Sequence, residues 1–127
     1  MKTAHWIIVA ALSALLAVAL GAFGAHALEA QLSKLGLTEV WQTANRYHFY
    51  HSFGILAIGW LSDRYQQSKW TWVGLSFLTG IIFFSGSLYA MGLSGVRTLG
   101  AITPIGGVFF MIGWGLLAYK VWKAAKA

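Results

Sequence analysis

The chain contains no cysteine, a single proline and only three acidic residues. The absence of cysteine excludes disulfides, thiolate metal sites and iron–sulfur clusters. Charge is scarce, because charged residues make up 9% of the 127 positions and hydrophobic residues make up 58%. With a mean hydropathy of +0.67, the chain lacks the charge that a soluble domain of this size needs to cover its surface. The composition therefore predicts a membrane protein.

The few charges also limit the chemistry of the chain. The carboxylates are Glu29, Glu39 and Asp63, and Asp63 is expected on the opposite side of the membrane from the two glutamates. No set of nucleophile, base and acid can be assembled from these residues, so we expect no enzymatic activity. The nine Lys and Arg residues flank apolar runs and form no patch. They indicate topology and contact with lipid headgroups, and they argue against nucleic acid as a partner.

Four apolar runs stand out in the sequence. A membrane-spanning helix needs about 20 apolar residues to cross about 30 Å of hydrocarbon, and helices are expected near residues 5–28, 45–62, 70–92 and 99–122. The short connections between them favour antiparallel neighbours. We therefore predict a single all-α domain over residues 1–127, an integral membrane four-helix bundle with antiparallel up-and-down topology.

Two segments near the N-terminus need separate interpretation. The run at 6–28 follows Lys2 and contains Ala-His-Ala at 25–27, as a cleaved secretory signal would. Its apolar core exceeds the roughly 7–15 residues of a signal, so we expect a retained helix. Segment 29–44 carries a leucine stripe and is expected to lie along the membrane surface as a short amphipathic helix.

The distribution of Lys and Arg predicts the orientation. One side carries six of them and the other carries three, and the richer side should be cytoplasmic. The richer side holds Lys2, Arg64, Lys69, Lys120, Lys123 and Lys126, and the poorer side holds Lys34, Arg46 and Arg97. We therefore expect a location in the bacterial inner (plasma) membrane with both termini in the cytoplasm.

The unusual polar residues fall at one depth of this topology, near the outer surface. They are His26, Glu29, Asn45, Arg46, Tyr47, His48, His51, Ser85, Tyr89 and Thr103. Antiparallel pairing of the first two helices brings His26 level with His48 and His51 in this prediction. Ionisable side chains at membrane depth normally face the interior of the protein and have partners. We expect these residues to form one polar cluster.

Four motifs carry a resemblance to a known family. "GAFGAHAL" (21–28), "TANRYHFYHSFG" (43–54), "FFSGSLYAM" (83–91) and "ITPIGG" (102–107) resemble, in order and spacing, those of the transmembrane-protein-256-like (YgdD-like) family. These are small four-helix membrane proteins of bacteria and mitochondria without a settled biochemical function. The resemblance covers nearly the whole chain and implies the architecture, but it supplies no catalytic residues.

Three functions stay open at this point. The first is a non-catalytic structural or accessory membrane component, whose partners are lipid and a larger membrane complex or further copies of the chain. The second is a metal- or haem-binding protein using His26, His48 and His51, since imidazoles from two helices suit a transition metal or haem, although nothing in the sequence requires a cofactor. The third is a small transporter or proton relay.

Overall fold

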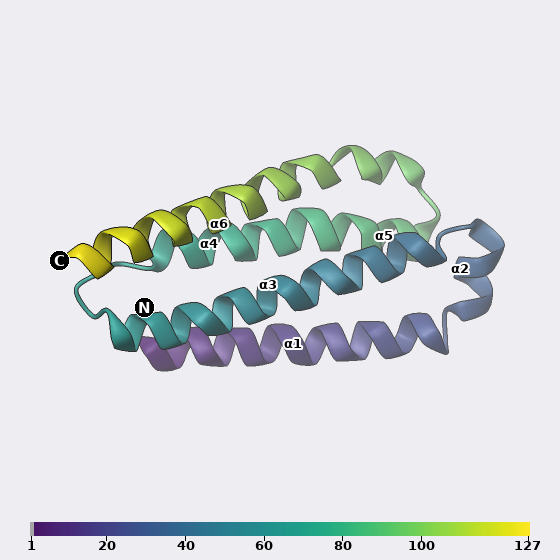
Figure 1. Ribbon diagram of the computed structural model, residues 1–127. Helices are drawn as coiled ribbons and strands as arrows, with labels where there is room; N and C mark the ends of the chain where they lie inside the picture. The colour runs from purple at the N-terminus through teal and green to yellow at the C-terminus, as the bar shows by residue number, and fades with distance from the viewer. Residues whose placement is uncertain (1) are drawn as a thin grey trace.

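A computed structural model describes residues 2–127, and Figure 1 shows their arrangement. The predicted all-α class is confirmed. Within the described residues, six α-helices are joined by one π-helix and one 3-10 helix. The elements are α1 (Thr3–Ala25), α2 (Glu29–Leu35), α3 (Thr38–Arg64), α4 (Thr71–Gly80), the π-helix η1 (Ile81–Ser85), α5 (Gly86–Ser94), the 3-10 helix η2 (Arg97–Ala101) and α6 (Thr103–Lys126). Because α4, η1 and α5 follow one another without a break, they form one continuous helical column.

The prediction of four membrane-spanning helices is wrong. In residues 2–127, three helical stretches are long and apolar enough to cross a membrane: Thr3–Ala25, Thr71–Ser94 and Arg97–Lys126. The remaining long helix, α3, does not qualify. Polar and ionisable side chains recur along it, from Glu39 through the histidines to Arg64, so no part of spanning length is apolar enough. The chain therefore consists of three apolar columns, one polar long helix and the short helix α2.

Several expected boundaries also shift. The helix expected from residue 45 begins at Thr38, because segment 38–44 belongs to α3 and not to a surface segment. Only α2, with seven residues, corresponds to the predicted interfacial helix. Helix α2 ends at Gly36 and α5 ends at Gly95, whose φ angles are 68° and 74°. Such left-handed conformations are accessible to glycine at little cost and terminate helices.

Helix α3 and the α4–η1–α5 column occupy the middle of the molecule, between α1 and α6. Helix α3 packs lengthwise against α1 on one side and against α4–η1–α5 on the other, and α6 packs against α4 and η1 (Figure 1). Successive long helices run in opposite directions, and both ends of the chain lie at the end of the molecule opposite α2 (Figure 1). Helix α3 is thus sheltered by the apolar columns.

Burial follows this arrangement. Ten residues of α3 are buried, whereas three residues of α1 and three of α6 are. Large apolar side chains on the outer helices stay exposed, such as Leu15 at 66% and Met111 at 68%. In water such a surface would be unfavourable, but hydrocarbon chains solvate it. The apolar outside and the polar-bearing inside are those of a protein embedded in lipid.

Candidate functional site

The two histidines of α3 contact different neighbours. His48 and His51 are both buried, but His48 meets side chains of α1 and α5, and His51 meets side chains of α6. Residues three apart on an α-helix point in directions about 60° apart, which is enough to place them against different helices. The two side chains therefore belong to two separate sites.

The site around His48 is a hydrogen-bonded network between three helices. Ser13 Oγ of α1 lies 3.1 Å from His48 Nε2 and 2.6 Å from Ser52 Oγ. On the other side of the ring, His48 Nδ1 lies 3.0 Å from the hydroxyl of Tyr89 on α5. Ser52 Oγ lies 2.8 Å from the carbonyl oxygen of His48. Ser13 is near the middle of α1, so the network lies at mid-depth of that apolar helix.

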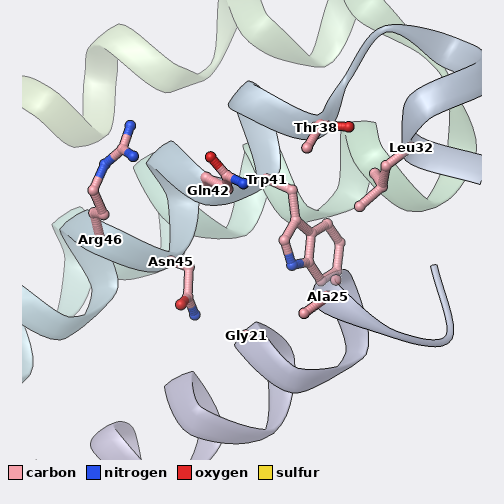
Figure 2. A pocket seen from close by; sticks show the side chains of 9 residues that line it. Gly21, Ala25, Leu32, Thr38, Trp41, Gln42, Asn45 and Arg46 are labelled. Carbon is pink, nitrogen blue, oxygen red and sulfur yellow. The ribbon is translucent and has the colours of Figure 1, made fainter. Parts of the chain in front are cut away.

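The register of α1 against α3 is fixed at the α2 end. Trp41 Nε1 donates to the carbonyl of Leu20 at 2.9 Å, and Asn45 Nδ2 donates to the carbonyl of Ala17 at 2.7 Å. Figure 2 shows the Trp41 indole beside Ala25 and the Asn45 amide directed toward α1. Both side chains line a pocket of about 270 Å³ between α1, α2 and α3, which Figure 2 shows. These two contacts set Ser13, and not His26, level with His48.

The direction of every hydrogen bond in the network can be assigned. A carbonyl only accepts, so the Ser52 hydroxyl donates to His48 O and must accept from Ser13. Ser13, having donated its hydrogen, accepts from His48 Nε2–H. The neutral ring then accepts at Nδ1 from Tyr89, whose oxygen accepts from Asn45 Nδ2 at 3.0 Å. The sequence of donors runs Asn45, Tyr89, His48, Ser13, Ser52.

This direction bears on chemistry. In nucleophilic catalysis a serine donates to a histidine base, whereas Ser13 accepts from His48. Both ends of the network are groups that do not titrate, the Asn45 amide and the His48 carbonyl. No buried side-chain nitrogen or oxygen in residues 2–127 lacks a partner. The arrangement thus binds helices together and holds one tautomer of His48.

His51 has its own fixed geometry. Its Nδ1 donates to the Tyr47 carbonyl at 2.6 Å, and its Nε2 accepts from Trp114 Nε1 at 3.0 Å. Because an indole nitrogen only donates, the ring is neutral with its hydrogen on Nδ1. The ring stacks on Phe110, with centroids 3.4 Å apart and planes inclined by 8°. His51 thereby attaches α3 to α6.

The structure does not bring the other predicted residues into this network. His26 and Glu29 are exposed at the end of α1 and the start of α2. Arg46 Nη2 lies 3.8 Å from a carboxylate oxygen of Glu39 and donates to Thr43.

Two hydroxyl residues and one aromatic residue of the predicted cluster make contacts elsewhere. Ser85 donates to the Ala44 carbonyl at 2.7 Å, and Thr103 lies 2.6 Å from the Ser87 hydroxyl. Tyr47 packs against Phe84 at a centroid distance of 4.5 Å. Among the described residues, no three His, Cys, Asp or Glu are grouped to hold a metal ion. The predicted three-histidine ligand set is therefore not assembled.

A groove opens above the His48 network between α1 and the α4–η1–α5 column. Its volume is about 510 Å³, within the roughly 300–1,000 Å³ of small-molecule sites. Ser13, His48 and Tyr89 form its floor. The walls include Val9, Leu12, Leu16, Leu78, Ile81 and Ile82. Two of these belong to the π-helix η1, an element often found at functional sites.

Comparison with known proteins places the chain in a family. Residues 20–107 match the family described as "Protein of unknown function (DUF423)". The chain belongs to the DUF423 family. A UPF0382 membrane protein of Staphylococcus saprophyticus is 49% identical over 118 residues, 93% of this chain and 97% of that protein. The UPF0382 membrane protein YwdK of Bacillus subtilis is 46% identical over 110 residues, 86% of this chain and 89% of that protein. No solved structure matches the chain significantly.

Membership of the DUF423 family corrects the family that the motifs suggested. The DUF423 family is different from the transmembrane-protein-256-like family that the motifs resemble. The prediction is confirmed only in that both are families of small membrane proteins without a known function. With relatives named as membrane proteins and three helices apolar enough to span a bilayer, this DUF423 protein is a membrane protein of a family of unknown function.

Sequence reasoning missed two residues of the DUF423 protein's buried sites. Ser13 completes the His48 network and Trp114 completes the His51 site. Ser13 is the one Ser or Thr within the apolar run 6–28, and that isolation was the available signal. No comparable signal distinguishes Trp114, because the chain contains seven tryptophans.

Proposed function

We propose that this protein is a non-catalytic binding protein of the membrane, which holds a lipid-soluble molecule in the groove above His48. The observation that carries the proposal is the pairing of aliphatic walls with a polar floor. The network holds three helices together, and it also presents the side chains of Ser13 and Tyr89 to the groove. Lipid-soluble ligands combine a long apolar part with a few polar atoms, and binding sites mirror that division.

The absence of enzymatic activity is part of the proposal. Among the described residues that line the groove, none is a carboxylate or a cysteine. The Ser13 hydrogen is committed to Ser52, away from the histidine that would otherwise act as its base. This favours holding over conversion of the ligand.

The location and orientation remain those expected from the sequence. We propose the bacterial inner membrane, with the end that carries both termini in the cytoplasm, because that end bears the larger share of Lys and Arg. Lipid is the proposed partner of the exposed apolar side chains on α1 and α6. An accessory role fits a chain that offers binding and packing surfaces but no catalytic set.

A groove-filling substitution tests the proposal. A Cβ at Gly86, which lines the groove, would have Ile81 O at 3.8 Å as its nearest neighbour, so a larger side chain can enter the groove without a clash at its base. At Gly115 on α6 a Cβ meets nothing within 4 Å. Gly86→Leu and Gly115→Leu therefore make the same chemical change inside and outside the groove, and both replace glycine by a better helix former.

The assay uses the purified full chain in phosphatidylcholine nanodiscs, with tritium-labelled oleyl alcohol and oleyl methyl ether as probes. We expect saturable binding of at least one probe by the wild type and by Gly115→Leu, and at least tenfold weaker binding by Gly86→Leu. Binding of neither probe to the wild type, or equal binding by the two variants, would refute the proposal.

A further inference from the structure

The floor of the groove offers acceptors only. Each hydroxyl of Ser13 and Tyr89 uses its single hydrogen inside the network, toward Ser52 and His48 respectively. Each oxygen also accepts one bond, from His48 Nε2–H and from the Asn45 amide. A hydroxyl oxygen has two lone pairs, so one acceptor position is left on each, and both residues line the groove. His48 has no unused ring nitrogen, since both are bonded to hydroxyls.

The direction of the network makes this arrangement stable. Reversing the Ser13 hydrogen toward the groove or toward His48 would leave the Ser52 oxygen without its donor, and Ser52 itself cannot turn because the His48 carbonyl requires its hydrogen. A buried polar group left without its partner costs free energy. The hydroxyl oxygens of Ser13 and Tyr89 therefore remain acceptors when a ligand approaches.

Charge and shape restrict the ligand further. Among the described residues that line the groove there is no Lys, Arg, Asp or Glu. Ser13 lies near the middle of α1, a helix apolar enough to span the bilayer. A charged headgroup at that depth would be costly and unpaired. The walls are aliphatic, with leucine, isoleucine and valine, and they match a flexible hydrocarbon or isoprenoid chain.

We infer that the groove selects a neutral aliphatic lipid alcohol, whose hydroxyl donates to Ser13 or Tyr89. This inference rests on the proposed binding function and adds the chemical class of the ligand. A ketone, ester or ether presents only acceptors, and its oxygen would face the acceptor oxygens of the floor without a hydrogen between them. A fatty acid would bring a charge to a groove lined by no cation.

The test compares two probes that differ in one hydrogen-bond donor. Oleyl alcohol and oleyl methyl ether share one chain and one oxygen, but only the alcohol has an O–H. The full chain is placed in nanodiscs of phosphatidylcholine, a lipid without a hydroxyl group. Unlabelled alcohol or ether is then added to displace bound tritium-labelled oleyl alcohol. We expect the ether to compete about tenfold more weakly, the size of one hydrogen bond to an otherwise unpaired group.

Variants locate the effect. Ser13→Ala removes one acceptor from the floor and should reduce the preference for the alcohol. Ser76→Ala is the control, because it removes a buried serine hydroxyl that donates to Trp72 O at 2.8 Å and does not line the groove. Equal competition by alcohol and ether, or better competition by the ether, would overturn the inference and leave the binding function standing. If neither probe binds, the proposed function itself fails.

Discussion

His51 illustrates how a single ring can hold two helices together at a fixed distance. Its two nitrogens are engaged in opposite senses, one donating to the Tyr47 carbonyl and one accepting from Trp114. The stack on Phe110 adds contact between the same helices. Because the indole nitrogen can only donate, protonation of Nε2 would break this attachment. The residue is therefore a structural connector between α3 and α6 in its neutral form.

Removing the donor tests that role at the scale of one residue. Trp114→Phe keeps the aromatic ring but leaves His51 Nε2 unpaired, and we expect a loss of about 1 kcal/mol of unfolding free energy, typical of an interhelical hydrogen bond in a membrane protein. Trp72→Phe is the control, since Trp72 is 68% exposed. The unfolding free energies of both variants and of the wild type are measured by adding dodecyl sulfate to the protein in detergent micelles. Equal losses in the two variants would contradict the connector role.

The residue scale also shows what a sequence can and cannot indicate about the site. His48, His51, Asn45 and Tyr89 stood out because polar side chains are rare in this chain. Whether they converge depended on the register between two helices, which no local pattern reports. His26 is also a rare polar residue of this chain, yet its side chain is exposed. Ser13, and not His26, lies beside His48.

At the scale of elements, one boundary explains that error. Helix α3 was expected to begin near residue 45, but it begins at Thr38. At a rise of 1.5 Å per residue, seven additional residues move the histidines about 10 Å further from the start of the helix. They therefore lie opposite the middle of α1 and not opposite its end. The polar residues at 38–44 concealed the start, because segment 29–44 is predicted from the sequence to lie along the membrane surface, whereas its last seven residues belong to α3.

The short helix α2 is attached to the rest of the fold through backbone groups. Gln31 Nε2 donates to the carbonyls of Gly92 and Leu93 at 3.0 and 3.1 Å, and Arg97 Nη2 donates to the Leu35 carbonyl at 2.7 Å. A helix of seven residues would be marginal alone. These bonds and the left-handed turn at Gly36 hold it across the end of the bundle.

The turn at Gly36 provides the prediction at this scale. Its φ is 68°, and a Cβ there would meet only Arg97 Nη2 at 3.6 Å, so space is available and conformation is the constraint. Gly36→Ala should cost about 1 kcal/mol, the usual penalty for placing an L side chain in the left-handed region. Gly115→Ala, within α6 and facing open space, should be neutral or stabilising. Melting temperatures in detergent distinguish them, and a neutral Gly36→Ala would show that the turn does not need the left-handed conformation.

At the scale of the whole molecule, polarity is arranged from the inside outward. The helix with the most polar side chains is the one most sheltered, and the two outer helices present leucine, isoleucine and methionine. Uncharged polar side chains are thus buried while large apolar ones are exposed, whereas a soluble protein buries most of its large apolar side chains. Composition alone could predict the membrane, and the hydropathy along residues 38–64 is what excludes α3 as a span. What the structure adds is that the apolar helices pack around this polar helix.

The orientation of the molecule is the last prediction. The chain has no cysteine, so a single introduced thiol reports one position without background. Gln67→Cys places it at the end that carries both termini, and Thr98→Cys places it in η2 at the opposite end. With six cations at the first end and three at the second, we expect a membrane-impermeant maleimide to label Thr98→Cys in right-side-out vesicles and Gln67→Cys only in inverted ones. The reverse pattern would mean that the richer end faces outward. Equal labelling of both positions in one type of vesicle would mean that the chain inserts in both directions, because nine cations divided in this way would then be too weak a bias to set the topology.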